Sequence, residues 1–193
     1  KIPTKNLVDF APEPDLPQSY IDDAAQKADI AIITLGRNAG ELWDREAKDY
    51  YYLSNTETTL LKRVCDTFHA LNKKVVVVLN IGGPIDVASW RHIPDVILLA
   101  WQTGQEGGYA LANILSGKVN PSGKLAVSFP VKYSDVPSAN SFPGVPAENP
   151  VNAFYEEGIY VGYRYYQTFN VKTAYEFGYG LSYTDFTYSP LKI

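Results

Sequence analysis

The chain has 193 residues, of which 46% are hydrophobic and 20% charged, and this balance excludes a largely disordered protein. Its net charge of −4 excludes the basic footprint that nucleic-acid-binding proteins carry. Its apolar runs, such as Val75–Leu79, are too short to span a bilayer, so neither nucleic acid nor a membrane is expected as a partner.

The first elements alternate between helix and strand. Residues 1–17 contain four prolines, which is typical of an extended linker. A helix is predicted over Gln18–Lys27, followed by a buried strand over Asp29–Leu35. A capping box that runs from Ser54 to Glu57 then predicts the start of a helix over Asn55–Leu71, where apolar residues recur at helical spacing.

The alternation continues through the middle of the chain, with Gly117 as the expected stop of a helix that ends near Ser116. The other predicted elements are strands over Val75–Leu79, Val96–Ala100 and Lys124–Phe129 and a short helix near Ile85–Trp90. Strands joined by helices through short links predict a mostly parallel sheet with helices on both faces. The expected fold is a flavodoxin-like, three-layer α/β/α sandwich over residues 18–150.

Residues 151–193 differ from this body in composition. They hold 13 of the 23 Phe and Tyr residues, interrupted by glycines. We expect an irregular aromatic tail that packs on the body or presents its rings to a partner.

Three loops follow the carboxyl ends of the predicted strands: Gly36–Arg45, Asn80–Pro84 and Trp101–Gly108. In parallel sheets, ligands bind in such loops. Glu41 lies in the first loop beside Trp43, and a carboxyl group next to an indole can have the raised pKa of a general acid. From the residues alone two alternatives stay open: a solvated loop glutamate, or an ion-pair partner of Arg37 or Arg45.

Other reactive side chains have simpler explanations. Glu106 heads a predicted helix, where helix capping is favoured, and the side chains of the adjacent Glu156 and Glu157 should point apart. Cys65 falls on the apolar stripe of its helix, which favours core packing. Neither histidine has a second ligand at metal-binding spacing, so no metal and no cofactor is expected.

Five motifs occur in an order that resembles one known family. They are Gly40-Glu41-Leu42-Trp43-Asp44-Arg45, Val75–Pro84, Trp101–Gly108, Asn120–Pro130 and the tail segments Tyr160–Tyr166 and Tyr175–Tyr183. They resemble the α/β sandwich domain that follows the catalytic barrel in glycoside hydrolase family 3, which includes β-glucosidases. The resemblance runs from about Pro12 to Tyr183.

The resemblance implies a retaining, exo-acting β-glycosidase in which Glu41 is the general acid/base. It also implies that Asp44 and Arg45 support the loop, and Trp43 is expected to border the aglycone side of the pocket. One departure affects this loop, because Leu42 stands where the family usually has a second glycine. The implied substrate is a β-glucoside or a cello-oligosaccharide.

Two parts of the family pattern do not occur in this chain. The family's nucleophile is an aspartate in a Ser-Asp-Trp motif of a (β/α)₈ barrel, whereas Ser134-Asp135 is followed by Val136 here. The first strand and helix of the family's sandwich domain are also expected to be missing from this chain, before Lys1. We therefore expect a barrel domain as the partner, with the 193 residues inactive alone. Two rival hypotheses are a flavodoxin-like ligand-binding domain and a non-catalytic scaffold.

Overall fold

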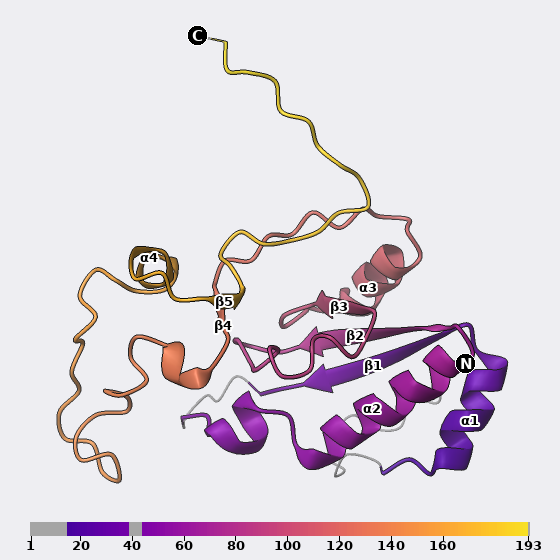
Figure 1. Ribbon diagram of the computed structural model, residues 1–193, viewed down its shortest axis with the longest axis horizontal. Coiled ribbons are helices and arrows are strands. Elements are labelled where there is room, and N and C mark those ends of the chain that lie inside the picture. The colour runs from indigo at the N-terminus through magenta and orange to yellow at the C-terminus, as the bar shows by residue number, and fades with distance from the viewer. Residues whose placement is uncertain (1–14, 39–43, 193) are drawn as a thin grey trace. The chain divides into compact units, whose positions relative to one another are not determined.

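Three strands form the main sheet in the computed structural model, which describes residues 15–38 and 44–192. They are β1 (Ile30–Gly36), β2 (Lys74–Asn80) and β3 (Val96–Leu99), in the spatial order β1-β2-β3. β2 and β3 are parallel, and Figure 1 shows the arrow of β1 pointing the same way. The carboxyl ends of all three strands therefore lie at one edge of the sheet, and their amino ends lie at the other.

The central strand carries much of the core. Every residue from Val75 to Leu79 is buried, so both faces of β2 are covered, as is typical of a strand in the middle of a parallel sheet. The edge strand β1 is only partly covered, and its alternate residues Ile30 and Ile32 are exposed, so the prediction that this strand is buried is wrong. The unbroken apolar run of β2 and the mixed pattern of β1 follow from these positions in the sheet.

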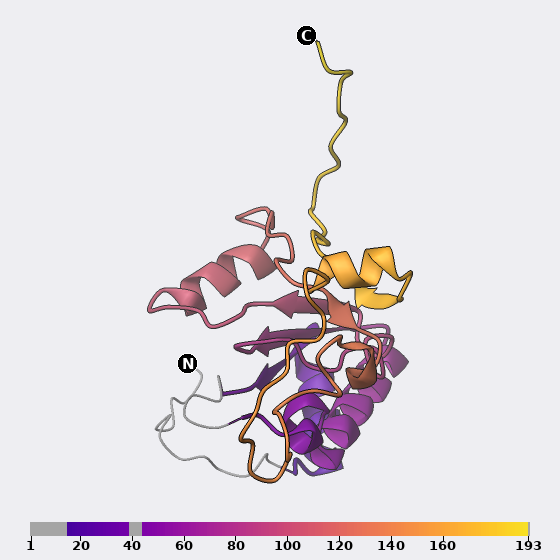
Figure 2. The same cartoon turned by 90° about the vertical axis from the view of Figure 1, so that its left-hand side faces the viewer.

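Two helices pack in the same part of the chain, α1 (Gln18–Lys27) and α2 (Asn55–Ala70). They contact each other, and α2 also contacts β1 (Figures 1 and 2). Cys65 on α2 is fully buried, which confirms its core role, and this burial, followed by the charges of Asp95 and Asp66, raises the thiol pKa to about 11. The described residues between β1 and α2 include a π-helical turn, η1 (Ala47–Tyr51).

The chain divides into two compact units. The first comprises Lys1–Leu79 and Trp90–Leu99, and the second comprises Asn80–Ser89 and Ala100–Ile193. The elements of the second unit are α3 (Gly107–Leu115), β4 (Phe129–Pro130), the 3₁₀ turn η2 (Tyr133–Asp135), α4 (Tyr163–Thr168) and β5 (Thr173–Tyr175). In this unit β4 and β5 form a separate antiparallel pair. The division into residues 1–17, 18–150 and 151–193 stays a prediction.

The prediction of a fourth strand over Lys124–Phe129 is wrong. β4 begins only at Phe129, and the residues before it pair with the aromatic tail instead. The amide of Leu125 donates to the carbonyl of Tyr179 at 2.8 Å, and its carbonyl accepts from the amide of Gly178 at 2.8 Å. The alternating pattern predicts a strand of the main sheet, but the hydrogen-bond partners of Leu125 come from a segment more than fifty residues later.

The prediction of a short helix near Ile85–Trp90 is also wrong, because the structure has an irregular stretch and a turn there. The carboxylate of Asp86 accepts hydrogen bonds from both the amide and the hydroxyl of Ser89. Such local side-chain bonds favour turns over helices. The other predicted elements of the body are confirmed within one or two residues, including the helix stop, where Gly117 takes a left-handed φ of 73°.

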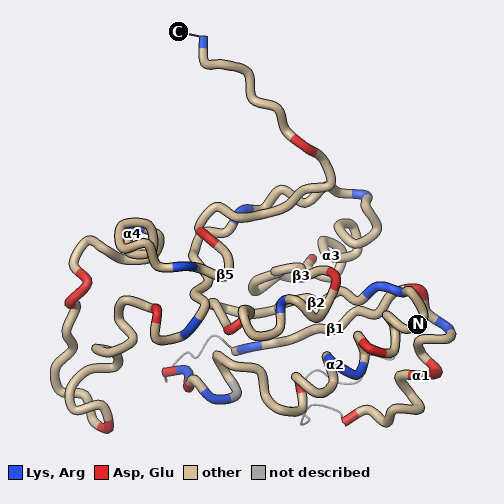
Figure 3. Tube along the Cα trace, in the orientation of Figure 1, with Lys and Arg blue, Asp and Glu red and all other residues tan. Residues whose placement is uncertain are grey.

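The aromatic tail exposes many of its rings. Tyr155 and Tyr188 are 85% and 90% exposed, whereas Tyr166 on α4 is buried. Few charged residues interrupt this part of the chain, which is mostly tan in Figure 3. No helix among the described residues combines the length and the apolar character that crossing a membrane requires. The predicted class, an α/β fold with a mostly parallel sheet, flanking helices and a largely irregular tail, is confirmed.

Candidate active site

The first of the three predicted loops leaves the carboxyl end of β1. Of its candidate residues, Glu41 and Trp43 lie outside the described residues, so their predicted roles stay predictions. Asp44 and Arg45 are described, and both side chains are exposed. Gly36 ends β1 and Arg37 follows it, and at this point the structure places a polar network.

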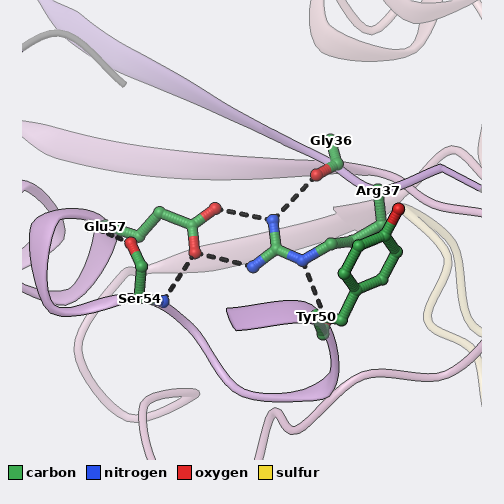
Figure 4. A network of polar contacts seen from close by, with 5 residues as sticks. All are labelled: Gly36, Arg37, Tyr50, Ser54 and Glu57. Atoms are coloured by element: carbon green, nitrogen blue, oxygen red, sulfur yellow. Dashed lines mark hydrogen bonds and ion pairs between the residues drawn. The ribbon is translucent and has the colours of Figure 1, made fainter. Parts of the chain in front are cut away.

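The centre of the network is a bidentate ion pair between Arg37 and Glu57 (Figure 4). The two terminal nitrogens of the guanidinium donate to the two carboxylate oxygens of Glu57, each at 2.6 Å. Arg37 Nε donates to the carbonyl of Tyr50 at 2.8 Å, and one terminal nitrogen donates to the carbonyl of Gly36 at 2.7 Å. Four of the five N–H donors of Arg37 are therefore engaged.

Glu57 has a second role in the same network. It is the third residue of α2, and its carboxylate accepts from the amide of Ser54 at 2.9 Å, while Ser54 Oγ accepts from the amide of Glu57 at 3.1 Å. This reciprocal pair is the predicted capping box, which is confirmed. One carboxylate thus caps α2 and holds the arginine that follows β1.

The network is buried. The side chains of Arg37 and Glu57 are each only 6% exposed. The attraction between two oppositely charged groups in bidentate contact is stronger in such buried surroundings than in water. The network joins the end of β1, the turn η1 and the start of α2, which are the described elements on either side of residues 39–43. Glu41 lies outside the described residues, so the alternative that it is an ion-pair partner of Arg37 or Arg45 stays open.

The second and third loops belong to the other compact unit. Trp101, two residues after the end of β3, has a left-handed φ of 53°, which is rare for a bulky residue, and its ring centroid lies 6.2 Å from that of Phe129. Glu106 is the N-cap residue of α3, as predicted, but its side chain makes no capping hydrogen bond, so that part of the prediction is wrong. Its φ of −90° and ψ of 13° differ from the extended conformation typical of a side-chain N-cap.

A second polar cluster lies at the amino ends of the strands, away from Arg37. Asp95 accepts hydrogen bonds from Lys74 Nζ, His69 Nε2 and the amide of Val75, all at 2.8 Å. The bond from Lys74, followed by that from the Val75 amide, holds the pKa of Asp95 well below its usual range. Within residues 15–38 and 44–192, no group of three or more His, Cys, Asp or Glu side chains could hold a metal ion.

The sequence does not reveal the pairing of Arg37 with Glu57. Each residue had a local explanation, Arg37 as a loop arginine and Glu57 as part of a capping box. No local pattern links them, because they are twenty positions apart and meet only where the end of β1 approaches the start of α2.

Comparison with known proteins identifies the chain's relatives. A model described as the glycosyl hydrolase family 3 C-terminal domain matches residues 13–163. β-Glucosidase A of Butyrivibrio fibrisolvens is 42% identical over 202 residues, covering 90% of this chain and 23% of that protein. An exo-α-(1→6)-L-arabinopyranosidase of Bifidobacterium breve is 41% identical over 189 residues, covering 92% of this chain and 24% of that protein.

Solved structures show the same relationship. The structure of β-glucosidase 3B from Thermotoga neapolitana in complex with glucose superimposes with a TM-score of 0.85 at 55% sequence identity. The match covers 88% of this chain and 24% of that chain. The 193 residues therefore span about a quarter of the length of the relatives that they match.

Proposed function

The chain belongs to glycosyl hydrolase family 3, as the C-terminal domain of that family, and on this basis we propose that it supplies the general acid/base of a retaining β-glycosidase. Glu41 is the proposed acid/base. The nucleophile is an aspartate of a (β/α)₈ barrel domain outside these residues. The single observation that carries the proposal is the family match over residues 13–163, which includes the loop with Glu41.

The proposed substrate is a terminal, non-reducing β-D-glucosyl residue, as in a β-glucoside or a cello-oligosaccharide. This choice is supported by the names of several relatives, which are β-glucosidases. The arabinopyranosidase relative has nearly the same identity, so the sugar has to be tested apart from the reaction type. The test compares kcat/KM for methyl β-glucoside with kcat/KM for methyl α-L-arabinopyranoside.

Two carboxyl groups perform the reaction in two steps. In the first, the barrel aspartate attacks the anomeric carbon while Glu41 donates its proton to the departing glycosidic oxygen. In the second, Glu41 as carboxylate takes a proton from water, whose oxygen attacks the anomeric carbon and releases the aspartate. Two inversions at one carbon leave the configuration retained, and Glu41 regains its proton at the end of the cycle.

The barrel domain is also the proposed partner of the aromatic tail. A monomer rarely exposes large contiguous apolar patches, yet many tail rings are exposed in these residues, including Phe154, Tyr155 and Phe177. We expect them to be covered in the whole enzyme. Hydroxyl-radical footprinting of the native whole enzyme should therefore label these rings weakly, and strong labelling of all three would contradict a docking role.

The experiment that tests Glu41 is the Glu41→Ala substitution in the whole enzyme. A sugar alkoxide needs protonation as it leaves, so kcat/KM for cellobiose should fall by about 10²–10⁴-fold. A nitrophenolate leaves without help, so kcat/KM for nitrophenyl β-glucoside should fall much less. Its kcat should still fall, because hydrolysis of the glycosyl-enzyme needs the base.

Azide provides the control for this assignment, since it attacks without a base. It should speed turnover of the nitrophenyl substrate by the variant and yield the β-glycosyl azide, with configuration retained. Equal losses on both substrates without azide rescue would remove Glu41 from the role. The purified 193 residues alone, which lack the nucleophile, should show no turnover of either substrate.

A further inference from the structure

We propose that Arg37 and Glu57 are positioning residues for the general acid/base: their buried ion pair holds together the two ends of the chain segment on which Glu41 lies. The inference rests on the proposed role of Glu41. It assigns to the pair an effect on proton transfer to the substrate, beyond its contribution to folding.

The positions of the two residues carry the first step. Arg37 is the first residue after β1, and Glu57 lies in the first turn of α2. Their bidentate contact at 2.6 Å therefore joins the two ends of the chain segment that connects the strand to the helix. The bond from Arg37 Nε to the carbonyl of Tyr50 adds η1 to the same junction.

Burial and geometry carry the second step. Both side chains are almost fully enclosed, and the planar guanidinium satisfies three acceptor groups, Glu57, Tyr50 and Gly36, at the same time (Figure 4). A lysine at this position would keep the charge but would have one nitrogen atom to place among these acceptors. The requirement for arginine therefore concerns geometry more than charge.

Proton transfer is sensitive to such geometry. A general acid has to lie within about 2.6–3.2 Å of the oxygen that it protonates, and a misplacement of about 1 Å from a distant substitution can cost on the order of 10²-fold in rate. If the junction between β1 and α2 loosens, Glu41 should lose proton-transfer efficiency before the enzyme loses its fold. Binding of the sugar should change little, because neither Arg37 nor Glu57 is proposed to contact it.

The experiment uses the whole enzyme with Arg37→Lys and Glu57→Gln, assayed on methyl β-glucoside and nitrophenyl β-glucoside. Asp95→Asn is the matched control, because it removes a charge from the other polar cluster of the same sheet, at the amino ends of the strands. Glu41→Gln is measured in parallel. The melting temperature of every variant is recorded.

The expected result is a loss that depends on the leaving group. Arg37→Lys should lower kcat/KM for the methyl glucoside by about 10–100-fold and for the nitrophenyl glucoside by less than about 3-fold, with azide speeding turnover of the latter. Asp95→Asn should lower the melting temperature without this selectivity. Glu57→Gln should repeat the selective loss, so it decides the matter if Arg37→Lys proves unable to fold.

Two results would overturn the inference, and they can be told apart. Equal losses on both substrates for both variants, while Glu41→Gln keeps its selective loss, would make the ion pair purely structural and leave the proposed function intact. Absence of a selective loss in Glu41→Gln itself would overturn the proposed function, and the positioning role would fall with it.

Discussion

The ion pairs at the two edges of the main sheet differ in how deeply their side chains are buried. At the carboxyl edge, the ion pair of Arg37 and Glu57 is enclosed, each side chain being 6% exposed. At the amino edge, Asp95 is 20% exposed and binds Lys74 and His69, which are 70% and 40% exposed. Burying a charge pair has a large desolvation cost, so a buried pair suits a junction that has to keep one geometry. A partly hydrated cluster can stabilise the strands at a lower desolvation cost.

The comparison predicts its largest stability effect at the carboxyl edge. Arg37→Met should lower the free energy of unfolding by about 3–5 kcal/mol, because it leaves Glu57 buried and without its cation. The double substitution Arg37→Met/Glu57→Met should recover more than half of this loss, since two apolar side chains of similar volume replace the pair. Urea unfolding followed by far-UV circular dichroism measures both values.

The double variant also separates stability from catalysis. If the positioning role is correct, it should regain stability but keep the selective loss on methyl β-glucoside, because the bonds to Tyr50 and Gly36 are not restored. A cost below about 1 kcal/mol for the single substitution would show that this pair behaves like a surface ion pair, and would remove the contrast between the two edges.

At the amino edge the expected effect is smaller and depends on pH. Asp95→Asn should cost about 1.5–3 kcal/mol at pH 7, the range for hydrogen bonds to a charged group. The pKa of Asp95 is lower in the folded chain than its unfolded value of about 3.9, so its stabilisation is fully present above that pH. It is lost as the pH falls through the folded pKa.

This dependence gives a direct measurement. Unfolding free energies at pH 7 and pH 3 should differ more for the unsubstituted chain than for Asp95→Asn, which has no titrating group there. Lys74→Met should reduce the same difference, because the hydrogen bond from Lys74 is the largest contribution to the lowered pKa. Identical pH dependence in all three proteins would exclude Asp95 as a source of acid sensitivity.

Local signals explain which elements of the fold are predictable from the sequence. α2 was predicted because its capping box and its apolar spacing are both readable within one stretch, and β2 because five buried residues follow one another. The strand predicted over Lys124–Phe129 failed because its partner, near Gly178, comes from the tail. Alternation shows that a segment is extended, but it cannot identify which segment donates to it.

The candidate site likewise has one part that a local motif predicts and one part that only the tertiary structure shows. Glu41 was selected by a motif, and the residues alone left open whether it is an acid or a solvated side chain. Arg37 and Glu57 are twenty positions apart and meet only because the end of β1 and the start of α2 come together. Their pairing is a property of the tertiary structure, so no local pattern could assign it.

The smallest effect in this series should come from an ion pair that is exposed on both sides. Lys27 and Asp23 on α1 lie four residues apart, with their charged atoms 2.6 Å apart and their side chains 71% and 59% exposed. A double-mutant cycle with Asp23→Ala and Lys27→Ala should give a coupling of about 0.3–0.5 kcal/mol, because water screens both charges. In 1 M salt the coupling should fall by about half, since the screening length of about 3 Å is then comparable to the separation of the two charges. The ion pair of Arg37 and Glu57 should keep most of its coupling in the same salt. Equal salt sensitivity of the two pairs would show that burial does not set their strengths, and the explanation offered for the two edges of the sheet would have to be abandoned.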